Sequence, residues 1–322
     1  MRPIIIKKNI CKVAFVGAGY MTTEHLKAFC NLPDVELSGI TSRTYSRAEK
    51  LAKEYKNLSV CDSIAELYEI TKAHLVVISV PELATRDVCE EAFKYPWTCL
   101  IEKPIGYNLT EAEAIEIMAI NQNCNVFIAL NRRHHNSTKI ILDDISKQKS
   151  PRLIHVYDQE DQTVALNMGQ PDLVVKNWMY ANSIHVIDYF NIFCRGNIIK
   201  IDPIVEWDAT TPFLVMTKLT YDSGDIGIYE AVWNTPGPWA VTVTTQEKRW
   251  ELRPLEQASF QSYGSRRLEV VPINVLDTEF KPGLRVQASE AVQAALDKPH
   301  SLPSLNDAMK LMRLIHTIYD ER

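Results

Sequence analysis

The sequence lacks the patterns that mark several classes of protein. Its seven scattered cysteines form no CxxC or CxxH pair, so we expect neither a disulfide framework nor a zinc site, and a reducing, cytoplasmic location. No apolar run approaches the roughly 18 residues that cross a bilayer. Acidic and basic residues are interspersed, with a formal net charge of −5, so no basic stripe is present for nucleic acid or an anionic membrane. We therefore expect a small-molecule partner.

Internal repeats and low-complexity linkers are absent too. With 46% hydrophobic and 23% charged residues the chain has an ordinary globular composition, so disorder is not expected. Its 322 residues exceed a typical single core, which favours two domains. We predict a dinucleotide-binding domain over residues 1–130 and a substrate-binding and oligomerisation domain over residues 131–322.

The first domain is predicted to be a Rossmann domain with a doubly wound parallel sheet. From residue 12 to about 130, short β-branched runs alternate with longer helical patterns, which indicates βαβ units. The runs are continuously apolar, as strands covered on both faces are. Ser46, Ser63 and Thr110 are each followed three residues later by Glu, which predicts capping boxes. The expected strands are Val13–Val16, Leu37–Ile40, Leu75–Val80, Thr98–Ile101 and Val126–Leu130.

The second domain is predicted to be α+β, with a large, mainly antiparallel sheet. Beyond about residue 150 the runs lengthen and are joined as in hairpins, with turns expected at Asp222–Asp225 and near Gln246–Lys248. One helix is expected over residues 183–194 and a closing helix over Ser304–Tyr319.

The stretch VAFVGAGYMTTEHLKAF follows the first strand and opens a helix. Gly17 permits a tight turn, and Gly19 lets the backbone approach a pyrophosphate at the helix N-terminus. Thr22 takes the third glycine position of the GxGxxG fingerprint, which is therefore incomplete. A plain strand-to-helix turn is the alternative, but the βαβ context favours a dinucleotide site that includes Tyr20 and Met21.

The ends of the next two strands offer further cofactor contacts. The second strand is followed by Ser42 and Arg43, with Arg47 beyond, and no acid stands where a carboxylate would hold an NAD ribose. An arginine there can accommodate a 2′-phosphate, so NADP is slightly favoured over NAD, although solvated arginines are the alternative. Ser79 and Pro81 follow a later strand, where a loop would pass the adenosine and nicotinamide ribose.

The triplet Glu102-Lys103-Pro104 ends the fifth expected strand, at the sheet edge where ligands bind in open α/β folds. A surface ion pair of Glu102 with Lys103 is the alternative, and such a pair contributes little. The apolar TCLI before the triplet favours a buried strand that delivers Lys103 to the cofactor site, with Glu102 orienting it.

The GxGxx turn, the EKP triplet and an HxxD helix in an α+β second half together resemble the glucose–fructose oxidoreductase/inositol dehydrogenase (Gfo/Idh/MocA) family. The resemblance continues through HLKAF, LNRRHH, NSIHVID and SLNDAMKLMRLIHTIY and covers essentially the whole chain. It implies NAD(P)-dependent oxidation or reduction of a sugar, sugar derivative or nucleotide-linked sugar, with Lys103 at the reacting oxygen. It also implies a turn fixed by Pro104, often after a cis peptide, and a homodimer or homotetramer formed through the second domain's sheet.

His185 and Asp188 lie three residues apart and would share one helix face. An imidazole can act as general base in alcohol oxidation and as general acid in the reverse reaction. The alternative is a structural histidine capped by Asp188. The family's better-known dehydrogenases carry an aspartate four residues before this histidine, where this chain has Ala181. Either Lys103 and His185 suffice, or Asn182, Tyr180 or Asp188 substitutes for that aspartate.

Further candidates surround these motifs. Asn131, Arg132 and Arg133 could hold a substrate hydroxyl, carboxylate or phosphate, although interdomain salt bridges are the alternative. His134 and His135 have no ligand partner at metal spacing, so no metal is expected. Two other functions stay open: a redox-neutral epimerase or glycosidase that recycles NAD, and a non-catalytic NAD(P)-binding sensor. Side chains that could line a sugar pocket, or pack in the core, are Trp178, Tyr180, Asn182, Trp233, Asn234 and Trp239.

Overall fold

The computed structural model describes residues 10–319, which form two compact units. The first unit comprises residues 10–105 together with Ala114–Ala129 and Leu284–Leu305. The second comprises Gly106–Glu113, Leu130–Gly283 and residues 306–319. Within residues 10–319, no helix has both the length and the apolar character required to cross a membrane.

The first unit is built on a six-stranded parallel sheet in the order β3-β2-β1-β4-β5-β6. This is the strand order of a Rossmann sheet, so the prediction of a doubly wound parallel sheet is confirmed. The strands β1, β4, β5 and β6 are almost entirely buried, which explains their continuous apolar character. The strands are β1 Cys11–Val16, β2 Val35–Thr41, β3 Ser59–Cys61, β4 Leu75–Ile78, β5 Thr98–Glu102 and β6 Val126–Ala129.

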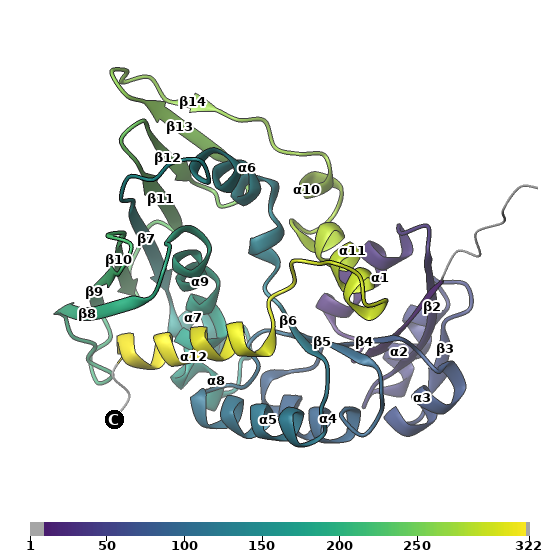
Figure 1. Ribbon diagram of the computed structural model, residues 1–322. Helices are drawn as coiled ribbons and strands as arrows, with labels where there is room; N and C mark the ends of the chain where they lie inside the picture. Colours follow the sequence, from purple (N-terminus) through teal and green to yellow (C-terminus); the bar gives the residue numbers. More distant parts are fainter. Residues whose placement is uncertain (1–9, 320–322) are drawn as a thin grey trace, which may run out of the picture. The chain divides into compact units, whose positions relative to one another are not determined.

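Helices cover both faces of this sheet (Figure 1): α1 and α11 lie on one face, and α4 and α5 lie on the other. Strand β3 was not predicted, because three residues with an exposed Ser59 give no apolar run. The helices of this part of the chain are α1 Tyr20–Cys30, α2 Tyr45–Ala52, α3 Ile64–Thr71, η1 Glu82–Ala84, α4 Thr85–Ala92, α5 Leu109–Asn121 and α11 Leu284–Ala295.

One of the three expected capping boxes caps its helix. Ser63 is the N-cap of α3, and its hydroxyl accepts a hydrogen bond from the backbone N of Glu66 at 3.1 Å. The predictions at Ser46 and Thr110 are wrong, because both residues lie inside their helices, as the second residue of α2 and of α5. The side chain of Asn108 caps α5 instead, accepting a hydrogen bond from the backbone N of Glu111 at 2.9 Å.

The segment Leu284–Leu305 belongs to the first unit, although the sequence analysis placed it in the second domain. Helix α11 packs against α1, and Arg285 Nε donates to Asn31 Oδ1 at 2.6 Å. The backbone N of Ile128 donates to Pro303 O at 3.1 Å, which adds the segment to the edge of β6. A helical pattern in the sequence shows which face of the helix is apolar but not which core that face covers. A domain boundary predicted at residue 130 therefore could not include a later segment that packs on the first unit.

The second unit contains an eight-stranded sheet in the order β14-β13-β12-β11-β7-β10-β9-β8. Its neighbouring strands are antiparallel except β7 and β10, which confirms the expected mainly antiparallel sheet. The hairpins expected at Asp222–Asp225 and near Gln246–Lys248 join β9 to β10 and β11 to β12. The strands are β7 Leu153–Glu160, β8 Ile198–Val205, β9 Leu214–Tyr221, β10 Ile226–Trp233, β11 Ala240–Thr244, β12 Lys248–Leu252, β13 Ala258–Ser262 and β14 Glu269–Val270.

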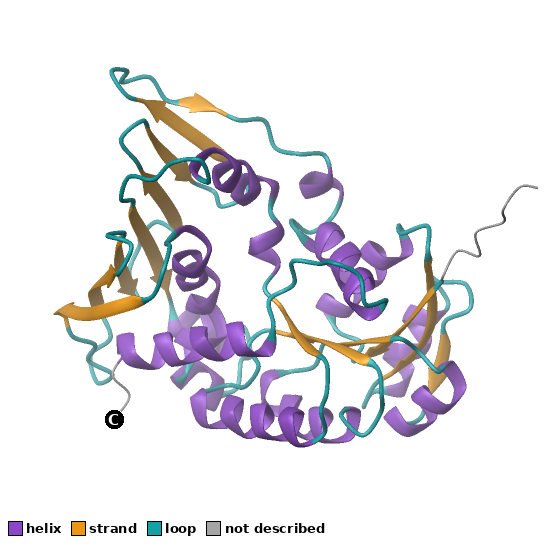
Figure 2. Cartoon of the chain, in the orientation of Figure 1, coloured by secondary structure: helices purple, strands orange, loops and turns teal. Residues whose placement is uncertain are grey.

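One face of this sheet is covered by helices (Figure 2), with α9 against β7 and β11 and α6 against β13. In β9 and β10 buried side chains alternate with half-buried ones, as expected for one covered and one open face. The expected helices are present as α9 and α12. The helices and turns are η2 Asn131–His134, α6 Asn136–Ile145, α7 Gln162–Asn167, α8 Asp172–Lys176, the π-helical turn η3 Met179–Ser183, α9 Ile184–Phe193, α10 Leu276–Glu279 and α12 Leu305–Tyr319.

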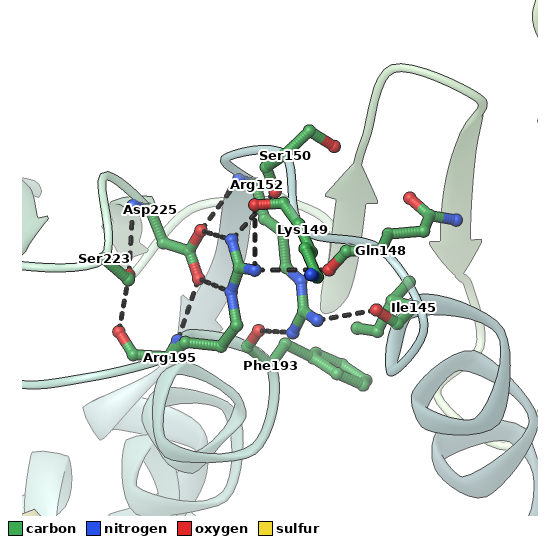
Figure 3. A network of polar contacts seen from close by, with 9 residues as sticks. All are labelled: Ile145, Gln148, Lys149, Ser150, Arg152, Phe193, Arg195, Ser223 and Asp225. Carbon is green, nitrogen blue, oxygen red and sulfur yellow. Dashed lines mark hydrogen bonds and ion pairs between the residues drawn. The ribbon is translucent and has the colours of Figure 1, made fainter.

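A network of buried charge ties these elements together (Figure 3). The Asp225 carboxylate, in the β9–β10 turn, accepts from Nε and Nη2 of Arg195 at 3.0 and 2.6 Å. It also accepts from the backbone N of Arg195 at 2.8 Å and of Arg152 at 2.9 Å. The buried Arg152 guanidinium donates to Phe193 O and Ile145 O, at the ends of α9 and α6. The network thus joins β7, α9, α6 and the β9–β10 turn.

The network holds the pKa of Asp225 below its usual value: burial acts to raise it, and the hydrogen bonds from Arg195 and the backbone outweigh burial. A carboxyl whose pKa is lower in the folded state contributes stability above its unfolded pKa, about 3.9. That contribution is lost as the pH falls through the folded pKa.

Asp225→Asn should lower the free energy of unfolding at pH 7 by about 3 kcal/mol, because Arg152 and Arg195 lose their shared carboxylate. The deficit should shrink as the pH falls below about 4, because the carboxyl of the unfolded wild type then binds a proton, and it should vanish below the lowered folded pKa. Urea unfolding at several pH values measures both effects. Asp202→Asn is the control, because the Lys200–Asp202 ion pair is a surface pair, worth about 0–1 kcal/mol. Equal deficits in the two variants would contradict the prediction.

Candidate functional site

The turn after β1 lies at the switch point of the six-stranded sheet, where β2 and β4 flank β1 and where nucleotides bind in open α/β sheets. Gly17 has φ +110°, and a Cβ there would lie 2.0 Å from Ser79 O. Its backbone N donates to Thr41 O at 2.8 Å. A side chain at this position would displace the turn from both flanking strands, so the turn requires glycine. Pro81 is exposed in the loop after β4.

The N-terminus of α1 fits a phosphate group. Gly19 is the N-cap, no side chain caps the helix, and its first turn has no acidic residue. A Cβ at Gly19 would meet nothing within 4 Å, so open space adjoins the first amides of the helix. Tyr20 is exposed and Met21 is half-buried beside that space. Thr22, in the third fingerprint position, is fully buried, so its side chain belongs to the core.

The tip of β2 carries cations and no acid. Strand β2 ends at Thr41, whose carbonyl binds the Gly17 turn, so the residues that follow adjoin the nucleotide turn. Arg43 and Arg47 are exposed, and residues 42–48 include no Asp or Glu. Ser42 Oγ accepts from the backbone N of Thr44 at 3.3 Å, which shapes the loop. The tip of β2 therefore presents two arginines and no carboxylate.

The end of β5 presents the EKP triplet, with Glu102 as the last residue of the strand and Lys103 directly after it. The Lys103–Pro104 peptide is cis. Glu102 is bound by His25 of α1, whose Nε2 donates to Glu102 Oε1 at 2.7 Å. The His25 side chain is 1% exposed, and the sequence analysis did not single it out as a site residue. Its sequence signals are its place in the HLKAF segment and a polar residue beside Leu26 on the buried face of α1.

In the second unit, the structure places His185 at the start of α9, directly after the π-helical turn η3. The residue is 9% exposed. Its ring meets the Trp239 ring edge to face, with centroids 6.2 Å apart. The guanidinium carbon of Arg132 lies 4.7 Å from the centroid of the same tryptophan ring. An imidazole, an indole and a guanidinium are therefore brought together, a set that can contact a hydroxylated substrate.

Asp188 is held by an arginine. Its two carboxylate oxygens accept from Nε and Nη2 of Arg133 at 2.7 and 2.6 Å, a bidentate ion pair, and its side chain is 2% exposed. Burial opposes the charge of Arg133, but Asp188 offsets this and keeps the arginine pKa above its usual value. The pair fixes α9 to η2, three residues from His185.

Two proposed substrate residues have their polar groups engaged inside the second unit. Asn131 Nδ2 donates a hydrogen bond to Pro282 O at 2.9 Å. The two backbone segments pack closely there, because a Cβ added at Gly283 would lie 2.2 Å from Asn131 O. The hydroxyl of Tyr180, which is fully buried, lies 3.3 Å from His316 Nδ1. Both contacts join segments that are far apart in sequence.

Asn182 and Trp178 contact a carboxyl group that the sequence analysis missed. Asn182 Nδ2 lies 3.1 and 2.9 Å from the two oxygens of Glu160, and Trp178 hydrogen-bonds to the same group. Glu160 is 1% exposed. Burial raises its pKa well above the usual range, and the charge of neighbouring Asp158 adds to the rise. Trp233 is a core residue that packs against Trp207 and Tyr319.

Metal ligation has no support in the described part of the chain: residues 10–319 hold no group of three or more His, Cys, Asp or Glu side chains able to bind a metal ion. Burial and the charge of Arg132 lower the pKa of His135 to about 3, so this histidine is neutral at physiological pH.

Solved structures of similar fold cover nearly the whole chain. A dehydrogenase from Chromobacterium violaceum has a TM-score of 0.79 at 15% identity, over 97% of this chain and 95% of that protein. A UDP-N-acetylglucosamine 3-dehydrogenase from Acidithiobacillus ferrooxidans has a TM-score of 0.75 at 17% identity, and the match covers 96% of each chain. A 3-ketoreductase from Actinomadura kijaniata has a TM-score of 0.72 at 13% identity, over 97% of this chain and 98% of that protein. That enzyme was crystallised as a lysine-to-alanine variant with TDP-benzene and NADP. At these identities the likeness concerns the fold.

No curated protein matches the sequence. Residues 11–130 match the Gfo/Idh/MocA model, described as an oxidoreductase family with an NAD-binding Rossmann fold. That range spans β1 to β6 and includes the Gly17 turn, the β2 tip and the EKP triplet. Residues 11–130 therefore form an NAD-binding Rossmann domain of the Gfo/Idh/MocA oxidoreductase type.

Proposed function

We propose that the protein is an NAD(P)-dependent oxidoreductase that transfers a hydride between nicotinamide and a CH-OH or C=O group of a sugar, sugar derivative or nucleotide-linked sugar. The observation that carries the proposal is the Gly17 turn, which only glycine fits, beside the open N-terminus of α1. Gly17, Gly19, Tyr20 and Met21 would hold the pyrophosphate. The family of the first domain supplies the reaction class.

Within this proposal the nicotinamide, when bound, accepts or gives a hydride. His185 takes the hydroxyl proton during oxidation and returns it during reduction. Lys103 donates a hydrogen bond to the same oxygen and stabilises the negative charge that develops there. Asp188, bound to Arg133, holds the helix that carries His185.

The substrate class is proposed from the second-unit cluster and from relatives. Arg132, Trp239 and His185 combine an aromatic face with polar groups, which suits a sugar and its charged substituents. Two proteins of similar fold are described as a UDP-N-acetylglucosamine 3-dehydrogenase and a 3-ketoreductase bound to a TDP compound. We therefore favour nucleotide-linked sugars as the first substrates to screen.

We also propose a homodimer or homotetramer that assembles through the open face of the eight-stranded sheet. Leu153 is exposed there, and Ile226, Ile228 and Val232 on β10 are half-buried at alternate positions. Glu230 lies between Ile228 and Val232 and pairs with His155 of β7, so the face mixes apolar side chains with an ion pair, and such a face suits a self-complementary contact.

The cofactor preference is tested by Arg43→Ala. We expect the affinity for NADPH to fall about ten- to hundredfold relative to NADH, because hydrogen bonds to charged groups contribute about 1.5–3 kcal/mol. Fluorescence titration with each cofactor measures the ratio. Lys50→Ala is the control, since it removes an exposed cation from the last turn of α2. An unchanged ratio in Arg43→Ala would remove the case for NADP.

The catalytic roles are tested by Lys103→Ala and His185→Ala. Each should reduce kcat about 10²- to 10⁴-fold, the usual contribution of an acid or base, while NAD(P)H binding changes little. Absorbance of NAD(P)H during turnover on a panel of sugars and sugar nucleotides provides the measurement. Lys139→Ala and His300→Ala, at exposed positions, are the matched controls.

Three outcomes of that screen separate the alternatives. Full turnover in Lys103→Ala would refute its role. Product formation without net change in NAD(P)H, by protein that retains its nucleotide through dialysis, would indicate a redox-neutral enzyme. Binding of NAD(P) without turnover on any substrate, and indifference to loss of His185, would indicate a sensor.

The assembly is tested by Ile228→Glu, which places a charge at the centre of the open sheet face. We expect the mass from size-exclusion chromatography with light scattering to fall from that of an oligomer to that of a 36.7 kDa monomer. Ile117→Glu on α5, where the isoleucine is 58% exposed, is the control. Two variants of equal mass would argue against assembly through this face.

A further inference from the structure

Asp158 and Glu160 lie two residues apart on β7 and therefore point to the same, covered face of the sheet. Each is 1% exposed, and close contact between the two carboxyl groups helps to raise the pKa of Glu160. Two buried carboxylates at that separation repel each other strongly, and neither could donate a hydrogen bond. The contact therefore requires one proton on the pair.

The neighbours show which carboxyl group is ionised. Asp158 Oδ2 accepts from the hydroxyl of Tyr229 at 2.7 Å, and Oδ1 accepts from Trp239 Nε1 at 2.6 Å. Glu160 also has a donor near each oxygen, but at 2.9–3.4 Å, so the shorter hydrogen bonds favour Asp158 as the carboxylate and Glu160 as the proton carrier. The raised pKa of Glu160 agrees with this assignment.

The surrounding charges agree as well. A positive group near the pair is the guanidinium of Arg132: burial lowers its pKa, and the charges of Glu256, Asp158 and Glu160 partly offset that effect. The hydroxyls of Tyr229 and Tyr319 are 2.8 Å apart, and burial raises the pKa of both, so they stay neutral. A singly protonated pair places one negative charge in this buried site, whereas a doubly ionised pair would place two there, at a higher cost of burial.

The pair contacts both structures that border His185. On one side, Asp158 holds the indole of Trp239, which meets the imidazole edge to face. On the other side, Glu160 accepts hydrogen bonds from Asn182 and, at 3.4 Å, from Ser183 Oγ, in the turn that leads into α9.

We propose that Asp158 and Glu160 share one proton at neutral pH and that this pair, through Trp239 and the turn before α9, is a positioning device for His185. The positioning function rests on the proposed role of His185, whereas the shared proton does not.

The proton is tested with Glu160→Gln, because glutamine reproduces the shape and hydrogen bonds of protonated glutamate but cannot ionise. The wild type should show the infrared C=O band of a protonated carboxyl group at neutral pH, and the variant should lack it. Asp158→Asn should also lose the band, since its amide donates to an ionised Glu160. This second variant keeps the test open should Glu160→Gln fail to fold. Persistence of the band in both variants would overturn the shared proton.

Stability gives an independent check of the same proton. A carboxyl group whose pKa is raised on folding binds more protons in the folded state. The wild type therefore loses stability as the pH rises from the pKa of this group in the unfolded chain towards its pKa in the folded protein. The unfolding constant of the wild type relative to Glu160→Gln should therefore rise up to tenfold per pH unit between about pH 5 and 7. Glu230→Gln, on the open face of the same sheet, is the control. A ratio independent of pH would overturn the proposal.

Positioning is tested by NMR of protein labelled at histidine Cε1, with His185→Gln to assign the signal. In Asp158→Asn the side-chain NH₂ cannot accept a hydrogen bond, so one of the two donors to Asp158, Tyr229 or Trp239, loses its acceptor. We expect Trp239 to reorient, and the changed ring current should shift the His185 signal. Glu160→Gln should leave that signal in place. An unshifted signal in Asp158→Asn would overturn the positioning role. Neither readout needs turnover, so failure to find a substrate would overturn the proposed function alone.

Discussion

The second unit depends on the buried carboxylate of Asp225, which must find donors because an unpaired charge there would cost several kcal/mol. Its donors come from Arg152, just before β7, and Arg195, just after α9. Strand β7 carries Asp158 and Glu160, and α9 carries His185. One charge in a turn therefore fixes the two elements whose side chains form the candidate site of this unit.

The first unit was largely predictable because its signals are local. Continuous apolar runs gave the buried strands β1, β4, β5 and β6, and the order of runs and helical patterns gave the parallel sheet. Gly17 could be identified because the GxGxx pattern follows the first strand, and the structure gives the physical reason: a positive φ and contact with Ser79 O leave no room for another residue. Lys103 was placed correctly after β5 because its position depends only on where the strand ends.

The remaining features depend on partners distant in sequence. Glu160 looks like one of many acids until the fold places Asn182 and Ser183 against it. His25 similarly acquires a meaning only beside Glu102, 77 residues later. The failed capping box at Thr110 has a different cause: Asn108 competes for the same amides, and a spacing rule does not decide between two caps.

The packing of residues 284–305 on the first unit has a consequence for folding during synthesis. Helix α11 covers α1, and Pro303 bonds to the edge of β6, so the Rossmann unit draws its last pieces from the end of the chain. A ribosome that has released only the first 130 residues has therefore delivered all six strands without the helix that covers α1. Domains commonly fold as they emerge during synthesis, N-terminal first. Here the first domain to emerge must wait until nearly the whole chain has been made before its core is closed.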